Sequence, residues 1–316
     1  MKKYFSLLLI IVMVLTLCSC GQKQSGTITT TNPETVTDPT VSITDGVEVS
    51  LKGEYSFISG NVNNEYDVLG YYENLEEGKE FKAVGLYSWQ KTASLREEAE
   101  IAIKHDLPNN YEEITLIEND FWKKRGDCHY LCFTFFDEIT FDEPTYAQSF
   151  FFEEEDLIKQ FIIWYNVKPV TIPGMDIECY IPSYGKEVEL TQENIDNNMF
   201  ASYTFPDSFF ADVSFYAWDR NGYSIEDTIE WYEKNTKNYE IIDQYEYKSK
   251  ETGKTYECIE IGSDDDFYGE PCACLELNVF GEDKMFSLYF HTPEELADEY
   301  LASTGFAMMY GVKKAK

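Results

Sequence analysis

The sequence predicts an α+β protein, a tandem duplication of an antiparallel-sheet domain with packed helices. Three observations support this prediction. The segment Lys123–Pro144 aligns without a gap with Lys250–Pro271, and the segments on either side repeat in the same order. In each copy, a strand pattern that ends in tryptophan precedes a helix-start signal. Short polar connections join the later strand patterns, which favours antiparallel pairing of neighbouring strands.

Residues 1–20 have the pattern of a targeting signal. Lys2 and Lys3 precede an apolar stretch that is shorter than the roughly 20 residues needed to span a membrane. The stretch ends in Leu-Cys-Ser-Cys, which resembles the lipobox of bacterial lipoproteins. This resemblance implies that Cys20 is lipidated and becomes the mature N-terminus. We therefore expect a lipid anchor in the cell membrane, facing outside the cytoplasm; a plain secretory signal is the alternative.

Residues 21–46 are rich in Thr, Ser, Pro, Asn and Asp, and they contain no aromatic residue. A segment of this composition buries too little apolar surface to offset the entropy that it loses on ordering. The sequence therefore predicts a disordered tether that holds the folded part away from the membrane.

The first predicted repeat covers residues 47–168, where aromatic residues become frequent. A strand at 81–89 ends in tryptophan, and Ser94 with Glu97 then forms a capping-box pattern. The helix that follows is predicted by the spacing of Leu95, Ala99, Ala102 and Ile103. Further strands are expected at 112–122, 128–136, 146–153 and 157–165.

Residues 169–198 are predicted to connect the repeats, and the second repeat covers residues 199–316. A strand at 210–218 again ends in tryptophan. The capping box of Ser224 and Asp227 then predicts a second helix. Further strands are expected at 240–248, 255–261, 272–280 and 284–291.

Another capping-box pattern begins at Thr292, with Gly305 as its C-cap, and predicts a terminal helix. The order of strand, helix, antiparallel meander and terminal helix resembles the PsbP-like fold, an α/β/α sandwich. Members of that fold group are mostly binding or assembly factors without a shared active site. The resemblance therefore implies a non-catalytic function and supplies no site residues.

The chain is strongly acidic, with 58 acidic residues against 25 Lys and Arg and a formal net charge of −33. Phosphate binding needs a basic face, so this balance argues against nucleic acid as a partner. An acidic surface is expected to keep an exported protein soluble, and cationic partners are the alternative explanation.

Sequence signals for catalysis are sparse. The three histidines, His105, His129 and His291, stand outside any recognisable catalytic motif. The sequence also lacks the glycine loops that hold phosphates and the spacings typical of zinc ligands. No catalytic residue is therefore predicted.

Two acidic segments at corresponding places in the repeats form the candidate metal site. Clustered carboxylates supply the oxygen atoms that Ca²⁺ prefers, so calcium is the cofactor considered. Neither segment has EF-hand spacing, and an ordinary acidic surface loop is the alternative. The candidate ligands are Asp137, Asp142, Glu143, Asp264, Asp265 and Asp266.

Six cysteines follow the lipobox, and an even number favours disulfides outside the cell. The strands that carry Cys258 and Cys274 are predicted to be neighbours. Their expected register brings Cys258 opposite Cys274, or opposite Cys272, within disulfide distance. A bridge between Cys258 and Cys274 is the candidate, and buried thiols are the alternative.

Aromatic residues are candidates for a surface that stacks on sugars. Most of them occur in strand or helix patterns, so packing in the core is the simpler explanation. The candidates are Tyr71, Tyr72, Trp89, Trp122, Trp164, Trp218 and Trp231.

The preferred hypothesis is a membrane-anchored lipoprotein with two related domains, a non-catalytic binding or assembly module for an unknown protein or cell-wall partner. One alternative is a surface hydrolase that acts on a wall polymer, glycan or peptide. The other is the solute-binding lipoprotein of a transporter. A deep cleft with carboxyl groups of raised pKa would favour the enzyme, whereas a flat apolar patch would favour partner binding.

Overall fold

Antiparallel strands make up most of the described chain. In the computed structural model, strands account for 63% of the described residues and helices for 12%, and the strands form three sheets. The predicted α+β class, with its α/β/α sandwich, is therefore wrong. Residues 28–74, for which no strands are predicted, contain six strands. The predicted helix after Thr292 lies outside the described residues, apart from Thr292 and Pro293, which end a strand.

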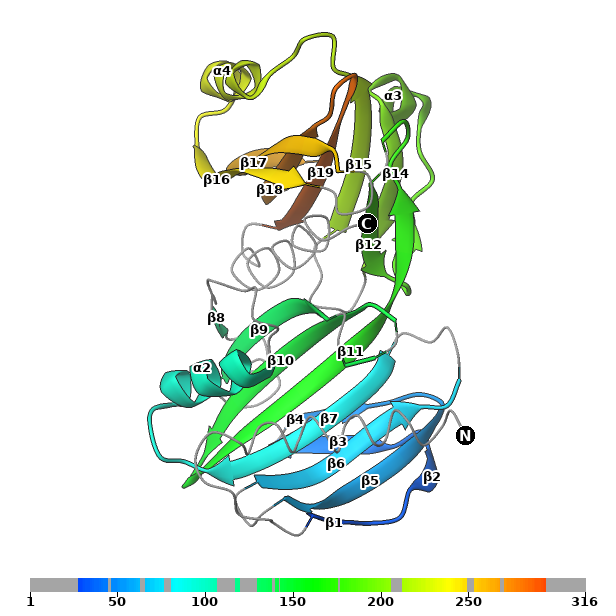
Figure 1. The fold of residues 1–316 in the computed structure, drawn as a ribbon, viewed down its shortest axis with the longest axis vertical. Coiled ribbons are helices and arrows are strands. Elements are labelled where there is room, and N and C mark those ends of the chain that lie inside the picture. Colours follow the sequence, from blue (N-terminus) through cyan, green and yellow to red (C-terminus); the bar gives the residue numbers. More distant parts are fainter. Residues whose placement is uncertain are drawn as a thin grey trace. The chain divides into compact units, whose positions relative to one another are not determined.

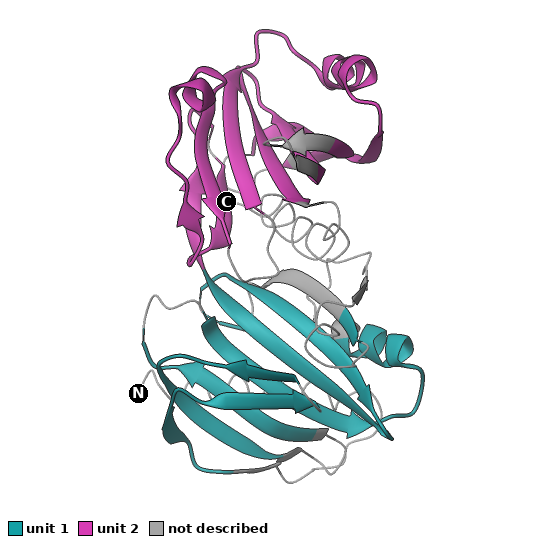
Figure 2. Cartoon of the chain, turned by 180° about the vertical axis from the view of Figure 1, so that it is seen from behind, with its two compact units in different colours: residues 1–166 teal, residues 167–316 magenta. Residues whose placement is uncertain are grey.

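The chain divides into unit 1, Met1–Asn166, and unit 2, Val167–Lys316, which we describe separately (Figure 2). The signal-like residues 1–20, Cys20 included, lie outside the described part. The structure describes residues 28–44, 47–62, 66–76, 81–106, 117–119, 130–137, 140–141, 143–175, 177–205, 212–248, 253–267 and 270–293.

Unit 1 contains most of a ten-stranded sheet and a separate hairpin (Figure 1). Its elements are β1 (Ile28–Thr30), β2 (Glu34–Thr37), β3 (Thr40–Thr44), β4 (Val47–Ser50), β5 (Glu54–Val62), β6 (Tyr66–Asn74), β7 (Phe81–Gln90), α2 (Leu95–Asp106), β8 (Ile117–Asn119), β9 (Tyr130–Asp137), β10 (Thr145–Glu154) and the greater part of β11 (Leu157–Thr171). The residues of β11 from Val167 onward belong to unit 2. The sheet runs in the order β1-β5-β6-β7-β11-β10-β9-β8, with β2 beside β5, and β3 pairs with β4.

Much of the predicted tether forms strands. Residues 28–44 contain β1 and β2, which pair with β5, and β3, which pairs with β4. In β3, exposed Thr and Ser alternate with buried Val41 and Ile43. This is the period-two pattern of a half-buried strand, and β-branched residues favour it. The tether was predicted from the overall composition of residues 21–46, which does not register the alternation of polar and apolar residues along the chain.

Unit 2 is built on a seven-stranded antiparallel sheet. Its elements are β12 (Glu178–Pro182), β13 (Lys186–Glu187), α3 (Gln192–Asp196), β14 (Met199–Thr204), β15 (Asp212–Asp219), α4 (Ile225–Asn235), β16 (Tyr239–Lys248), β17 (Thr255–Phe267), β18 (Glu270–Phe280) and β19 (Lys284–Pro293). The sheet runs in the order β13-β14-β15-β19-β18-β17-β16, while β12 pairs with the end of β11. The stretch 169–198, predicted as a connection, thus contains β12, β13 and α3.

The two main sheets share one strand order. In unit 1, β7 is followed along the sheet by β11, β10, β9 and β8; in unit 2, β15 is followed by β19, β18, β17 and β16. In each unit a helix follows the first of these strands in the chain: α2 after β7, and α4 after β15. The alignment predicted from sequence pairs β10 and β11 with β18 and β19, at positions 127 residues apart.

Helix α2 closes on the sheet of unit 1. Leu95 and Ala99 of the helix are buried in one cluster with Phe151 of β10 and Ile158 and Ile162 of β11. These side chains are between 0% and 7% exposed, so the helix and the sheet form a continuous apolar core.

Helix α4 begins as the sequence predicts. Ser224 Oγ accepts a hydrogen bond from the backbone N–H of Asp227, whose side chain accepts one from the backbone N–H of Ser224. These reciprocal bonds form a capping box and fix where the helix starts. Tyr232 is the large buried side chain of α4, and it packs with Ile259, Ile261 and other residues of the sheet.

Among the described residues, no helix combines the length and the apolar character needed to cross a membrane.

Candidate ligand-binding cavity

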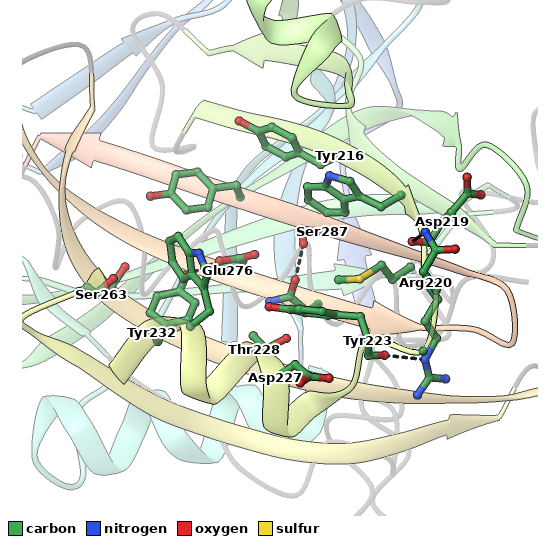
Figure 3. A pocket seen from close by; sticks show the side chains of 18 residues that line it. Tyr216, Asp219, Arg220, Tyr223, Asp227, Thr228, Tyr232, Ser263, Glu276 and Ser287 are labelled. Atoms are coloured by element: carbon green, nitrogen blue, oxygen red, sulfur yellow. Dashed lines mark hydrogen bonds between the residues drawn. The ribbon is translucent and has the colours of Figure 1, made fainter. Parts of the chain in front are cut away.

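A cavity of about 780 Å³ lies in unit 2, between α4 and one face of the sheet. Its residues come from β15, the turn before α4, α4 itself, β17, β18 and β19. Figure 3 shows Tyr216, Tyr223 and Tyr232 arranged around Glu276 and Ser287. All lining residues belong to unit 2, so the cavity is a feature of that unit alone.

The floor of the cavity is set by alternation along β18 and β19. In β18, Leu275, Leu277 and Val279 are buried and absent from the cavity lining, whereas Glu276 and Asn278 line it. The same alternation in β19 brings Ser287 and Tyr289 to the cavity, where Ser287 pairs with Asn278 and Tyr289 with Glu276. Two central strands therefore place a polar floor beneath the helix.

Asn278 has an uncommitted hydrogen-bond donor on this floor. Its side chain is 2% exposed, and its Oδ1 accepts a hydrogen bond from Ser287 Oγ. Its Nδ2 has no hydrogen-bond partner among the described residues. A buried polar group without a partner costs free energy, so the amide is poised to donate to a bound molecule.

Glu276 places a carboxyl group in the cavity. The Tyr232 hydroxyl donates a hydrogen bond to its Oε2. Burial raises the pKa of Glu276, while the neighbouring side chains of Tyr232, Ser287 and Asn278 act in the opposite direction. Burial and the neighbouring Glu276 also raise the pKa of Tyr232, so this phenol stays protonated at neutral pH.

Aromatic side chains form the walls. Tyr216 and Trp218 stack, with ring centroids 5.5 Å apart and ring planes 3° apart. Trp231 of α4 also lines the cavity and is 52% exposed, unusually open for so large an apolar side chain. Large aromatic side chains with open faces provide stacking area for a ligand.

Charged groups at the rim are engaged in the fold. Asp219 pairs with Lys284, and Asp227 accepts the capping hydrogen bonds of α4. Arg220 donates to the backbone carbonyls of Tyr223 and Gly281, both at 2.8 Å, and also contacts the Glu257 carboxylate at 3.0 Å. Arg220 therefore holds the turn together rather than pointing an uncommitted cation into the cavity.

The candidate calcium ligands that the structure describes lie in β9, in β17 and just before β10. Glu143 is exposed and pairs with Lys82 at 3.6 Å. Asp264 lies within β17, where the sequence predicts a loop, and accepts a hydrogen bond from Asn238 at 3.0 Å. Among the described residues, no group of three or more His, Cys, Asp or Glu is placed to hold a metal. Outside the description lie Asp142 and the side chains of Asp137, Asp265 and Asp266.

The register of β17 and β18 does not fit the predicted Cys258–Cys274 bridge. Cys258 lies opposite Val279, while Cys274 lies opposite Ser263. The five positions between Cys258 and Ser263 span about 16 Å along a strand, far beyond disulfide reach. The sequence-based register assumed an early turn, whereas β17 continues to Phe267 through its acidic residues.

Sequence reasoning found part of this site. Trp218 and Trp231, two of the candidates for a stacking surface, line the cavity. The candidates Tyr71, Tyr72, Trp89 and Trp164 do not line it, and Trp122 lies outside the described residues. The sequence did not predict three polar residues of the cavity floor: Glu276, Asn278 and Ser287. The sequence feature that could indicate them is the alternation of polar with large apolar residues in β18 and β19. The same alternation is typical of a strand with one solvent-exposed face.

Comparison with known proteins gives no family for this chain. No protein-family model matches it, and no curated protein does. The solution structure of cyanobacterial PsbP (CyanoP) from Synechocystis sp. PCC 6803 is similar at a TM-score of 0.32 and 11% identity, covering 46% of this chain and 90% of that chain. The apo structure of the type VI secretion immunity protein TplEi from Pseudomonas aeruginosa is similar at a TM-score of 0.21 and 10% identity. The match covers 80% of this chain and 93% of that chain. The predicted likeness to PsbP is thus found at a low level, and no function is transferred from either protein.

Proposed function

We propose that this protein is a membrane-anchored extracytoplasmic lipoprotein whose second unit binds a small ligand without converting it. The observation that carries the binding proposal is the cavity under α4, with aromatic walls and the uncommitted amide donor of Asn278. Its volume of about 780 Å³ falls in the range of small-molecule sites. The signal pattern of residues 1–20, ending in Cys20, supports the lipid anchor.

A thermal-shift screen with a library of small metabolites tests ligand binding. Compounds that bind the folded protein raise its melting temperature by mass action. The effect is expected to disappear in Asn278→Phe, which places a large side chain in the cavity. Asn235→Phe introduces the same side chain at an exposed position of α4 outside the cavity, and it should keep the response. A library without any stabilising compound, or hits that survive in Asn278→Phe, would refute the proposal.

Metabolic labelling with a fatty acid tests the anchor. The wild-type protein is expected to incorporate the label and to sediment with membranes. Cys20→Ala should lose the label, because the acyl chains are attached to that sulfur in a lipoprotein. Equal labelling of both proteins would contradict the assignment of Cys20.

A hydrolase is the second candidate, because Glu276 combines a cavity position with a raised pKa, as a general acid does. Glycoside hydrolysis needs a second carboxyl group across the substrate. The carboxylates at the rim, Asp219 and Asp227, are held by Lys284 and by the helix cap. We therefore favour binding. Turnover of chromogenic glycosides or esters that is lost in Glu276→Gln would reverse this preference.

A further inference from the structure

The charges that line the cavity favour a cationic ligand. Glu276 lies on the floor, whereas of the other two lining acids Asp219 is paired with Lys284 and Asp227 caps α4. Arg220, the basic member of the lining, has its guanidinium committed to two backbone carbonyls and to Glu257. The interior therefore presents a carboxyl group without an opposing mobile cation among the described residues. A bound cation would supply the missing positive charge.

The aromatic walls suit the same kind of ligand. Six aromatic side chains line the cavity: Tyr216, Trp218, Tyr223, Trp231, Tyr232 and Tyr289. The faces of aromatic rings attract cations, most strongly where water is excluded. A carboxyl group among aromatic rings is a suitable environment for an organic ammonium group.

The hydrogen bonds already made on the floor distinguish between kinds of ammonium. A primary ammonium carries three N–H donors, each of which needs an acceptor. On the floor, Glu276 Oε2 accepts one hydrogen bond from Tyr232 and Asn278 Oδ1 accepts one from Ser287, so a primary ammonium would compete with these donors. A quaternary ammonium needs no acceptor at all, and it is attracted by ring faces and negative charge alone.

Asn278 sets a second requirement for the ligand. Its Nδ2 lacks a hydrogen-bond partner among the described residues, so the ligand should carry an acceptor oxygen. Asn278 follows Glu276 by two residues on the same strand, about 7 Å along it. The oxygen and the ammonium group must therefore be close together in one small molecule.

We propose that the cavity binds a quaternary ammonium compound with an oxygen a few bonds from its nitrogen, as in choline, with the ammonium beside Glu276 and the oxygen accepting from Asn278. This inference rests on the proposed binding function and names the ligand class. Two sources share this chemistry: a free choline-like solute and the head group of a choline phospholipid.

Isothermal titration of the full-length protein in a non-ionic detergent tests the proposal with matched probes. Choline is compared with 3,3-dimethylbutan-1-ol, which replaces the charged nitrogen by carbon, and with ethanolamine, its primary-amine counterpart. Choline is expected to bind at least about tenfold more tightly than either. Glycerophosphocholine distinguishes the source: binding as tight as that of choline indicates a lipid head group, and weaker binding indicates a free solute.

Two variants test whether the carboxylate of Glu276 binds the ammonium group. Glu276→Gln should weaken choline binding at least about tenfold and leave 3,3-dimethylbutan-1-ol unaffected. Glu233→Gln removes one charge from an exposed position of α4 outside the cavity, and it should change neither affinity. Circular dichroism spectra confirm that both variants fold.

Three outcomes would overturn the ligand class. They are equal binding of choline and its neutral analogue, full choline affinity in Glu276→Gln, and absence of choline binding. If the metabolite screen still finds compounds that need an open cavity, only the ligand class is wrong. If that screen finds none, the binding function itself is refuted.

Discussion

The two sheets carry their helices in corresponding places, but only one helix closes fully on its sheet through apolar side chains. In unit 1, Phe151 and Ile162 fill the space under α2 and are 0% and 3% exposed. The aligned residues in unit 2 are Asn278 and Tyr289, which line the cavity under α4. One strand order thus supports a packed core in one unit and a cavity in the other. The difference depends on a few side chains at the centre of the sheet.

A buried acid of unit 1 and a half-buried acid of unit 2 also differ. In unit 1, Glu98 is 6% exposed, and its carboxylate accepts hydrogen bonds from the backbone N–H and the hydroxyl of Thr92, the backbone N–H of Ala93 and the Trp89 indole. Burial acts to raise the pKa of Glu98, but these hydrogen bonds outweigh it, and the pKa is lowered. The pKa of Glu276 in unit 2 is raised. Glu98 is thus held as a structural anion, whereas Glu276 faces a cavity.

The largest expected effect comes from giving unit 1 the residue of unit 2. Phe151→Asn removes a fully buried ring and introduces a polar group, so the free energy of unfolding of unit 1 should fall by about 3–5 kcal/mol. Urea denaturation followed by circular dichroism measures this loss. The truncation at the aligned position of unit 2, Asn278→Ala, leaves the buried Ser287 hydroxyl without its acceptor and should cost about 1–2 kcal/mol. Similar losses in both units would show that Asn278 is as structural as Phe151.

Glu98→Gln is expected to have the second-largest effect. The amide keeps the shape but replaces one acceptor oxygen by a donor that faces other donors, so unit 1 should lose about 2–3 kcal/mol at pH 7. Because the folded-state pKa is lowered, the stabilisation by Glu98 is present above the unfolded-state pKa and disappears as pH falls through the folded-state value. The difference between the two proteins should therefore shrink between pH 7 and pH 3 in urea titrations. Glu100→Gln, two residues along the helix, is the control; a constant difference would exclude Glu98 as the titrating group.

Asn278→Phe gives unit 2 the residue of unit 1. The ring gains apolar contacts in the cavity, but the Ser287 hydroxyl loses its acceptor, so the free energy of unfolding should change by no more than about 1 kcal/mol. Ligand-induced stabilisation should nevertheless be abolished. A loss of several kcal/mol in the same urea titration would indicate that the amide holds the sheet rather than a ligand.

Much of the secondary structure could be predicted from local patterns. The capping box of Ser224 and the strands near 145–154 and 284–293 are confirmed, because they depend on neighbouring residues. The end of β17 was missed because aspartates disfavour strands in isolation, and here pairing with β18 overrides that preference.

The cavity could not be predicted in this way. The alternation in Leu275–Phe280 is equally consistent with a solvent-exposed face. Only the position of α4 shows that this face is covered, and a helix position depends on contacts between residues far apart in the sequence. The aligned pairs Phe151/Asn278 and Ile162/Tyr289 are the local signs of a difference between the units.

The smallest effect, and the sharpest contrast with Glu98, is expected for Glu276→Gln. The folded-state pKa of Glu276 is raised, so its favourable contribution is present below the unfolded-state pKa and is lost as pH rises through the folded-state value. Its titratable neighbours Tyr223 and Tyr232 also have raised pKa values and stay protonated in this range. At pH 7 the variant should therefore gain stability, by less than about 1 kcal/mol, and the gain should vanish toward pH 4. Urea titrations at the two pH values should thus show opposite trends with pH for Glu98 and Glu276; parallel trends would mean that Glu276, like Glu98, is stabilised as an anion.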